Sequence, residues 1–270
     1  FVYGQYLYIA DGNQGVQIVD ISNPASPVSA GNYAPSTTIS GYTYTGNVKG
    51  IALQGKYGYV VHEAEAYSVY LEIVDLSIPT VPVMLGRYKT GNSFRDLHVF
   101  GNTAYLAVFG HTRIPWGIIE VVDISNPQFP ALSANHSPFY PVTALFAASG
   151  YIYTVIQDYL TVYDETLPTN ESQVGLLKMD DDAEDIFVRN NYAYIADGTV
   201  GLVIADLSDP ANPQQVGNHD TSGEASAVFA NDSHIFVADG SSNKIVIFST
   251  AYPVMVSSPN GGEVWVAGTS

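Results

Sequence analysis

The densest group of side chains that could bind a cation is the acidic run at residues 180–185, Asp-Asp-Asp-Ala-Glu-Asp. Clustered carboxylate oxygens suit hard cations, so Asp180, Asp182 and Glu184 are candidate ligands for calcium. The run departs from an EF-hand loop, which needs glycine at position 185, where this chain has Asp. A solvated acidic loop is the favoured alternative, and the sequence suggests no cofactor other than calcium.

The histidines could take part in catalysis only if the fold gathered them with other ionisable groups. His62 opens a segment like the first half of a zinc-protease helix, but the second histidine, required at position 66, is alanine. The sequence has no Gly-x-Ser-x-Gly elbow, Walker loop or dinucleotide-binding glycine loop. The enzyme alternative is a lyase or hydrolase, and it needs a set of groups to converge in one pocket: Arg95, Asp96, His98 and His62. We predict a protein that is not an enzyme.

The charge balance narrows the set of partners. The chain has 9 Lys and Arg against 26 Asp and Glu, a formal charge of −17, and no cysteine. A surface this acidic repels phosphate backbones and anionic lipid, so we expect no nucleic-acid partner. No apolar run approaches the roughly 18 residues of a membrane-spanning helix, so we also expect no membrane insertion.

An internal repeat organises most of the chain. Val16-Gln-Ile-Val-Asp20 recurs as Leu71-Glu-Ile-Val-Asp75, as Ile119-Glu-Val-Val-Asp123 and within residues 201–206, with weaker copies at 160–164 and 244–248. The basic spacing is about 42 residues, with longer intervals between the early copies. Each repeat has four segments rich in Val, Ile, Tyr and Phe and bounded by turn residues; in the fifth repeat they are 183–189, 191–197, 201–207 and 213–219.

Four short strands per repeat, repeated six times, predict an all-β chain that folds as a β-propeller of six four-stranded blades. Seven blades are the alternative, and a β-sandwich would not explain the regular period. The predicted blades are residues 1–44, 45–90, 91–138, 139–178, 179–219 and 220–256. The enzyme alternative would use the mouth of the central channel of such a propeller.

The third strand of each blade carries two further predictions. Strand alternation predicts side chains buried between blades at Ile18, Ile73, Val121, Val203 and Ile247. The aspartates that end these strands should accept hydrogen bonds from the next backbone amides and fix the turns: Asp20, Asp75, Asp123 and Asp206.

The quoted third-strand segments resemble the LVIVD-repeat family, over about residues 1–250. Members of that family are typically propellers in large surface or secreted proteins, mostly without an assigned activity. Residues 257–270 resemble a linker and the opening strand of an Ig-like module of cell-wall proteins. The resemblance implies an extracellular or cell-surface location.

The longer early repeats place extra residues in two kinds of connection, from the second to the third strand and from one blade to the next. In a propeller these connections share one face, and insertions on one face commonly mark the binding face. The candidate binding residues are the Tyr, Trp, Arg and His side chains on that face: Tyr42, Tyr44, Tyr67, Arg95, His111, Arg113 and Trp116. We predict a noncatalytic binding or scaffold module with a protein or glycan partner. A self-assembling subunit of a surface layer or fibre is the alternative.

Overall fold

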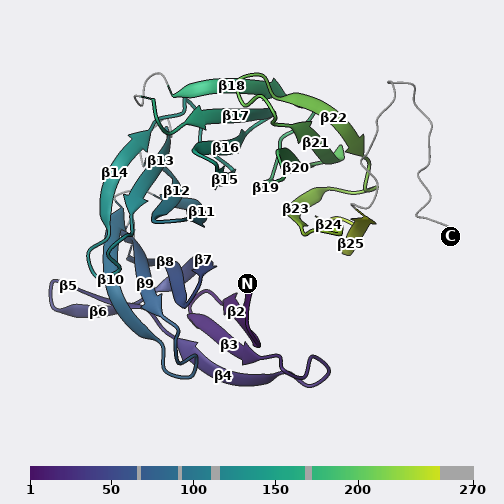
Figure 1. The fold of residues 1–270 in the computed structure, drawn as a ribbon. Coiled ribbons are helices and arrows are strands. Elements are labelled where there is room, and N and C mark those ends of the chain that lie inside the picture. The colour runs from purple at the N-terminus through teal and green to yellow at the C-terminus, as the bar shows by residue number, and fades with distance from the viewer. Residues whose placement is uncertain (66–67, 91–92, 111–115, 168–171, 250–270) are drawn as a thin grey trace. The chain divides into compact units, whose positions relative to one another are not determined.

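The computed structural model describes residues 1–65, 68–90, 93–110, 116–167 and 172–249, and these residues form β-strands and no helix. They therefore contain no helix that could cross a membrane. The strands form antiparallel blade sheets, each with its strands in sequence order (Figure 1). The predicted class, an all-β propeller of six blades, is confirmed.

The first compact unit, Phe1–Pro141, contains three blades. Blade 1 consists of β1 (Val2–Tyr3), β2 (Tyr6–Ala10), β3 (Val16–Asp20) and β4 (Val28–Tyr33), and it is followed by a separate hairpin, β5 (Ser36–Ile39) and β6 (Tyr42–Thr45). Blade 2 consists of β7 (Asn47–Gln54), β8 (Tyr57–Glu65), β9 (Ser68–Asp75) and β10 (Val83–Thr90). Blade 3 consists of β11 (Ser93–Phe100), β12 (Thr103–Phe109), β13 (Gly117–Asp123) and β14 (Ala131–His136).

The second unit, Val142–Ser270, contains the other three blades. Blade 4 consists of β15 (Ala144–Ala148), β16 (Tyr151–Ile156), β17 (Tyr159–Asp164) and β18 (Gln173–Lys178). Blade 5 consists of β19 (Asp185–Arg189), β20 (Tyr192–Asp197), β21 (Gly201–Asp206) and β22 (Gln214–His219), within two residues of the predicted segments at every boundary. The described part of blade 6 has three strands, β23 (Ala225–Ala230), β24 (His234–Asp239) and β25 (Lys244–Ser249).

In four blades the aspartate that ends the third strand fixes the turn that follows, as predicted. Its Oδ1 accepts a hydrogen bond of 2.8 Å from the backbone N–H two residues further on, at Asp20, Asp75, Asp123 and Asp206. These hydrogen bonds hold the pKa of each carboxyl below its usual value. The same bond occurs in one of the two weaker predicted copies, from Thr166 to Asp164, so this turn is kept where the rest of the repeat sequence has diverged.

Neighbouring blades within each unit are joined by backbone hydrogen bonds near the start of their first strands. The N–H of Val48 donates to the carbonyl of Gly12 (2.9 Å), and the N–H of Ala225 donates to that of Gly198 (2.8 Å). Both acceptors are the glycines of Asp-Gly turns that follow a second strand. The Asp-Gly turns therefore hold the next blade as well as reversing the chain.

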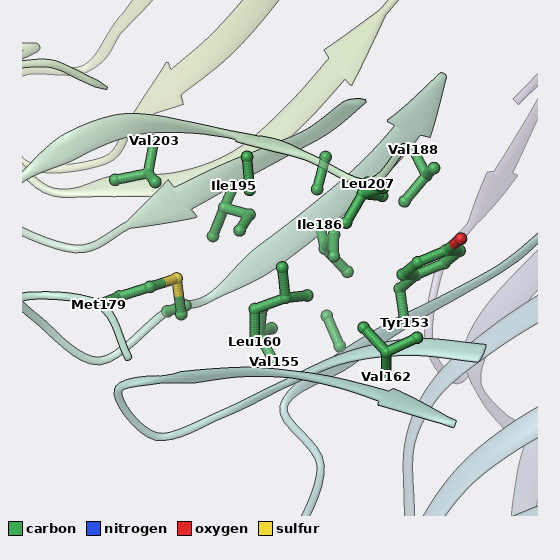
Figure 2. Close-up of a cluster of buried hydrophobic side chains, with 14 residues drawn as sticks. Tyr153, Val155, Leu160, Val162, Met179, Ile186, Val188, Ile195, Val203 and Leu207 are labelled. Atoms are coloured by element: carbon green, nitrogen blue, oxygen red, sulfur yellow. The ribbon is translucent and has the colours of Figure 1, made fainter. Parts of the chain in front are cut away.

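The core lies between the faces of adjacent blades. In the second unit, Leu160 and Val162 of blade 4 face Ile195 and Val203 of blade 5 (Figure 2). Four of the five predicted interblade residues are buried: Ile18, Ile73, Val121 and Val203.

The prediction for Ile247 is wrong, because its side chain is 56% exposed. The last third strand ends at Ser249, one residue after the predicted repeat position at Phe248, but Ile247 pairs with Phe236 as Ile18 pairs with Tyr8 and therefore has the predicted orientation. Within the second unit, the described residues place no further sheet on the face of β25 that carries Ile247.

Candidate functional site

Three aromatic side chains form an exposed group at one end of blade 3, which we call the aromatic cluster: Trp116, Phe139 and Tyr140. The Trp116 and Phe139 rings meet edge to face with centroids 5.2 Å apart, and the Phe139 and Tyr140 rings do the same at 5.0 Å. Their exposed fractions are 46%, 64% and 49%. The cluster therefore presents a large aromatic surface to solvent.

A glycine allows this cluster to form. Trp116 immediately precedes β13, which starts at Gly117, whereas Phe139 and Tyr140 lie in the connection after β14. A Cβ atom on Gly117 would lie 2.1 Å from the Tyr140 carbonyl oxygen and 2.9 Å from a side-chain carbon of Pro138. Only glycine lets this connection cross so close to the start of β13. The connection from the second to the third strand and the connection to the next blade, the two kinds predicted to bind a partner, thus meet in blade 3.

Sequence reasoning missed Phe139 and Tyr140. They belong to no long insertion, and the prediction relied on loop length. The signal that could have found them is the run Pro138-Phe-Tyr-Pro141, two adjacent aromatic residues between prolines in a connecting segment.

Arg95 lies beside the same end of blade 3. It is the extra residue of a β-bulge in β11, between Phe94 and Asp96, and its side chain is exposed. The guanidinium carbon lies 5.0 Å from the centre of the Phe109 ring, and Phe109 pairs with Gly117, the neighbour of Trp116. Among the described residues, Arg95 has no carboxylate within ion-pair distance.

The hairpin β5–β6 occupies the inserted connection between blades 1 and 2 and projects from the first unit (Figure 1). Its turn uses positive φ angles at Ser40 (52°) and Gly41 (86°), which is typical of a tight hairpin. Tyr42 is 71% exposed, whereas Tyr44 is half-buried. Two of the predicted binding residues, Tyr42 and Tyr44, therefore lie on this hairpin, and of the two only Tyr42 is widely exposed.

A buried polar network holds the base of this hairpin. Arg87 pairs with Glu72 and also donates a hydrogen bond of 2.6 Å to the Ser36 carbonyl at the start of β5. The Tyr33 hydroxyl donates to Glu72 (2.5 Å), and His62 Nε2 lies 3.2 Å from the same carboxylate. Burial alone would raise the pKa of Glu72, but the contacts with His62 and Tyr33 and the charge of Arg87 outweigh it and lower the pKa.

The two histidines named for the enzyme alternative lie in different surroundings. His62 is fully buried, stacks on Tyr70 with ring centres 5.4 Å apart, and contacts Glu72. Burial lowers the pKa of His98 to about 4. Asp96 accepts a hydrogen bond from the Leu97 amide (2.8 Å), next to the exposed Arg95. Because His62 is fully buried and contacts Glu72, it belongs to the network at the base of the hairpin and is not accessible to a ligand.

The predicted calcium ligands do not gather. Asp180, Asp182 and Glu184 are all exposed, and the described part of the chain contains no group of three His, Asp or Glu side chains that could hold a metal ion. Asp181 lies between them in sequence but accepts hydrogen bonds from the backbone and hydroxyl of Thr199, which lower its pKa. The geometry therefore favours a structural role for the acidic run.

Asp197, the last residue of β20, is fully buried. Its carboxylate makes no hydrogen bond of normal geometry to the described residues. Burial and the negative charges of Asp181 and Asp180 raise its pKa to about 6. This carboxyl is therefore poised to take up a proton near neutral pH.

Three of the predicted binding residues, Tyr67, His111 and Arg113, lie outside the described residues, as does the predicted further domain at 257–270.

The fold and its repeated turns define a β-propeller built from sequence repeats. The LVIVD repeat family matches residues 1–35, 45–90, 91–137 and 180–221, more than half of the chain, and the chain belongs to this family. No curated protein matches the chain.

Comparison with one solved structure supports the fold class and nothing further. The crystal structure of the computationally designed Ika8 protein superposes with a TM-score of 0.62 at 12% identity, covering 92% of this chain and 82% of Ika8. The computationally designed Ika4 protein gives a TM-score of 0.46 at 17% identity, covering 58% of this chain and 91% of Ika4.

Proposed function

We propose that this chain is a noncatalytic extracellular or cell-surface module that binds a protein or glycan partner through the aromatic cluster of blade 3. The observation that carries the proposal is the cluster itself, three aromatic rings in edge contact, each about half exposed or more. Side chains of this size are normally buried, and contiguous exposed aromatics mark binding surfaces.

The cluster is also suited to binding by its rigidity. Trp116 is attached to the first residue of β13, and the Phe139–Tyr140 segment rests on Gly117. Aromatic anchors held in this way lose little conformational entropy when a partner covers them. Arg95 adds a charged donor beside the rings.

The noncatalytic part of the proposal draws on the histidines. His62 is inaccessible, and His98 is largely neutral above about pH 4 because of its burial. The acidic charge of −17 supports a partner other than nucleic acid or an anionic membrane. The proposed location rests on the likeness of these repeats to those of surface and secreted proteins.

The direct test compares the double variant Trp116→Ala/Phe139→Ala with wild type on a printed glycan array and against the surface-protein fraction of the source cells. We expect the variant to lose binding with little change in melting temperature, because both side chains are exposed. Phe129→Ala is the matched control, since Phe129 is 74% exposed in the turn at the other end of blade 3. Loss of binding in the control alone would place the function at that opposite end and refute the proposal.

A structural subunit is the second candidate, and exposed isoleucines favour it. Ile245 and Ile247 both face solvent from β25, a strand whose residues are otherwise typical of a buried sheet. Sedimentation of the full chain tests this candidate. A concentration-dependent oligomer that Ile245→Lys/Ile247→Lys dissolves would support self-assembly, whereas a monomer at all concentrations would refute it.

A further inference from the structure

We infer that the ligand of the blade 3 site is an acidic glycan, a polysaccharide whose sugar rings carry carboxylates, which contacts the aromatic cluster and Arg95 together. This inference rests on the proposed function and specifies its ligand class. Its basis is one juxtaposition: a cation held on an aromatic ring, at the end of blade 3 that carries three exposed aromatic rings.

Among the described residues, Arg95 and Lys89 each lie over an aromatic ring and have no carboxylate partner. Lys49, Lys56, Arg87, Lys178 and Arg189 each pair with a carboxylate. Arg95 instead lies over Phe109, with no carboxylate partner among the described residues, although the chain has 26 acidic side chains. Stacking orients the guanidinium and leaves its N–H groups available to a ligand.

The position of Arg95 links it to the aromatic cluster. The bulge in β11 between Phe94 and Asp96 moves Arg95 out of the regular strand alternation. The ring beneath it, Phe109, ends β12 opposite Gly117, and Trp116 comes immediately before that glycine. At this end of blade 3, the cation therefore lies at β11 and β12, and the aromatic rings lie at the ends of β13 and β14.

A carboxylated sugar matches both features. A pyranose ring presents an apolar face of C–H groups, which stacks on aromatic side chains, and a uronic acid adds a carboxylate at its rim. An arginine fork binds a carboxylate with two parallel hydrogen bonds, which a lysine cannot do. The formal charge of −17 repels an anionic chain at long range, so the preference for a carboxylated sugar depends on the local contact with Arg95.

An acidic peptide is the rival ligand, and the geometry of the cluster disfavours it. An extended peptide gains affinity by adding a strand to a free sheet edge. The cluster lies at strand ends, before β13 and after β14, so its side chains do not follow such an edge. A peptide would have to bind there without backbone pairing.

The experiment measures binding of the full chain to three probes by calorimetry at physiological ionic strength: polygalacturonate, its methyl ester and poly-L-glutamate. We expect polygalacturonate to bind about tenfold more tightly than the methyl ester, the worth of one charge-assisted hydrogen-bonded contact. Poly-L-glutamate should bind weakly or not at all. Equal affinity for polygalacturonate and its ester, or tighter binding of poly-L-glutamate, would overturn the inference.

Variants separate this inference from the proposed function. Arg95→Gln should abolish the preference for polygalacturonate over its methyl ester, and Arg95→Lys should keep only part of that preference. Lys244→Gln removes an exposed cation from blade 6 and should change nothing. If Arg95→Gln keeps the full preference, the acidic-glycan inference fails while the binding module stands. If Trp116→Ala/Phe139→Ala leaves the affinity for all three probes and for the arrayed glycans unchanged, the proposed function fails as well.

Discussion

The contacts between blades differ in chemistry between the two units of the chain. In the first unit, the Tyr33 hydroxyl of blade 1 donates to Glu72 of blade 2, and the Tyr88 hydroxyl of blade 2 donates to Glu120 of blade 3 (3.1 Å). In the second unit, the residues at the matching positions are Leu177 of blade 4 and Val203 of blade 5, and both belong to one apolar cluster. The match follows from the strand register. Tyr33, Tyr88 and Leu177 each pair with the residue four positions before the aspartate that ends the third strand.

The comparison shows that one backbone repeat tolerates two ways of joining blades. An apolar contact depends on area and close packing and needs no particular partner. A buried carboxylate is stable only when several donors surround it, and Glu72 has three such neighbours in Tyr33, His62 and Arg87. The polar contact is therefore more specific and more easily broken by the loss of a single partner.

The polar contacts of the first unit also carry the inserted hairpin. Arg87 connects Glu72 to the Ser36 carbonyl, so the joint between blades 1 and 2 is also the anchor of the β5–β6 hairpin. In the second unit, no described hairpin projects between blades. In the first unit, the polar contact at Glu72 therefore both joins blades 1 and 2 and holds the base of the hairpin.

The largest effect should come from placing a charge in the apolar contact. Val203→Asp buries a carboxylate with no positive partner in the surrounding cluster, so we expect a loss of about 4–5 kcal/mol of unfolding free energy. Urea unfolding measures it, and Ile247→Asp in exposed β25 is the control. A Val203→Asp protein as stable as wild type would mean that blades 4 and 5 do not pack through this face.

The second effect should come from removing the carboxylate in the polar contact. Glu72→Ala leaves His62, Arg87 and Tyr33 without their shared acceptor, and we expect a loss of about 3 kcal/mol. Glu63→Ala breaks the exposed pair with Lys49 in the same blade and should cost less than about 1 kcal/mol. Equal losses in the two variants would erase the distinction between the buried network and a surface ion pair.

Acid should weaken the first unit through His98. Its pKa is about 4 in the fold against 6.5 in the unfolded chain, so the unfolded chain binds more protons between these pH values. The stability that His98 contributes is complete above pH 6.5 and is lost as the pH falls toward 4. We expect His98→Phe to remove about 3 kcal/mol of this pH dependence, measured by urea unfolding at several pH values. An unchanged slope would show that His98 is not desolvated.

Acid should have the opposite effect at Asp197 in the second unit. Its pKa is raised from 3.8 to about 6, so the folded chain binds more protons and stability increases as the pH falls from about 6 to 4. Asp197→Asn removes the cost of burying the charge, and we expect it to stabilise the chain by about 1–2 kcal/mol at pH 7.5 but not at pH 4. Asp181→Asn is the control, because the pKa of Asp181 is lowered and its loss should destabilise. Destabilisation by Asp197→Asn at pH 7.5 would contradict this account.

The smallest effect should be the same in both units. Asp123→Ala and Asp206→Ala each remove one exposed turn hydrogen bond of the same length, so we expect small and equal decreases in melting temperature. Asp123→Asn and Asp206→Asn keep an acceptor and should stay close to wild type. A much larger decrease in one unit would mean that its turn has acquired a further role there.

The parts of this protein that the sequence predicted well are local. The strands of blade 5 and the turn bonds at Asp20, Asp75, Asp123 and Asp206 depend on residues that are close in sequence. Trp116 and Tyr42 were also identified as exposed aromatic residues in connections, and both are exposed. Ile247 is exposed for a reason that is not local: the described residues of the second unit place no further sheet on its face of β25.

The candidate site was only partly predictable, because it depends on which connections meet. Phe139 and Tyr140 contact Trp116 only through the crossing at Gly117, and no local pattern announces that crossing. The acidic run at 180–185 looked like a cation site because sequence spacing alone brings its carboxylates together. In the fold, Asp181 accepts a hydrogen bond from the Thr199 backbone, and Asp180, Asp182 and Glu184 are exposed to solvent.

The sequence by itself determined the repeat, the strand order within each blade and the turns, since these follow from side-chain alternation and from hydrogen bonds between near neighbours. Only the tertiary structure decided which contacts between blades are polar. The Tyr33–Glu72 and Tyr88–Glu120 hydrogen bonds join residues 39 and 32 positions apart, in different blades. Glu72 and Glu120 have the sequence pattern of solvent-facing strand residues. In the fold they are buried, because the preceding blade brings a tyrosine hydroxyl to each and Arg87 of the same blade pairs with Glu72. That arrangement depends on packing across blades, which no window along the chain contains.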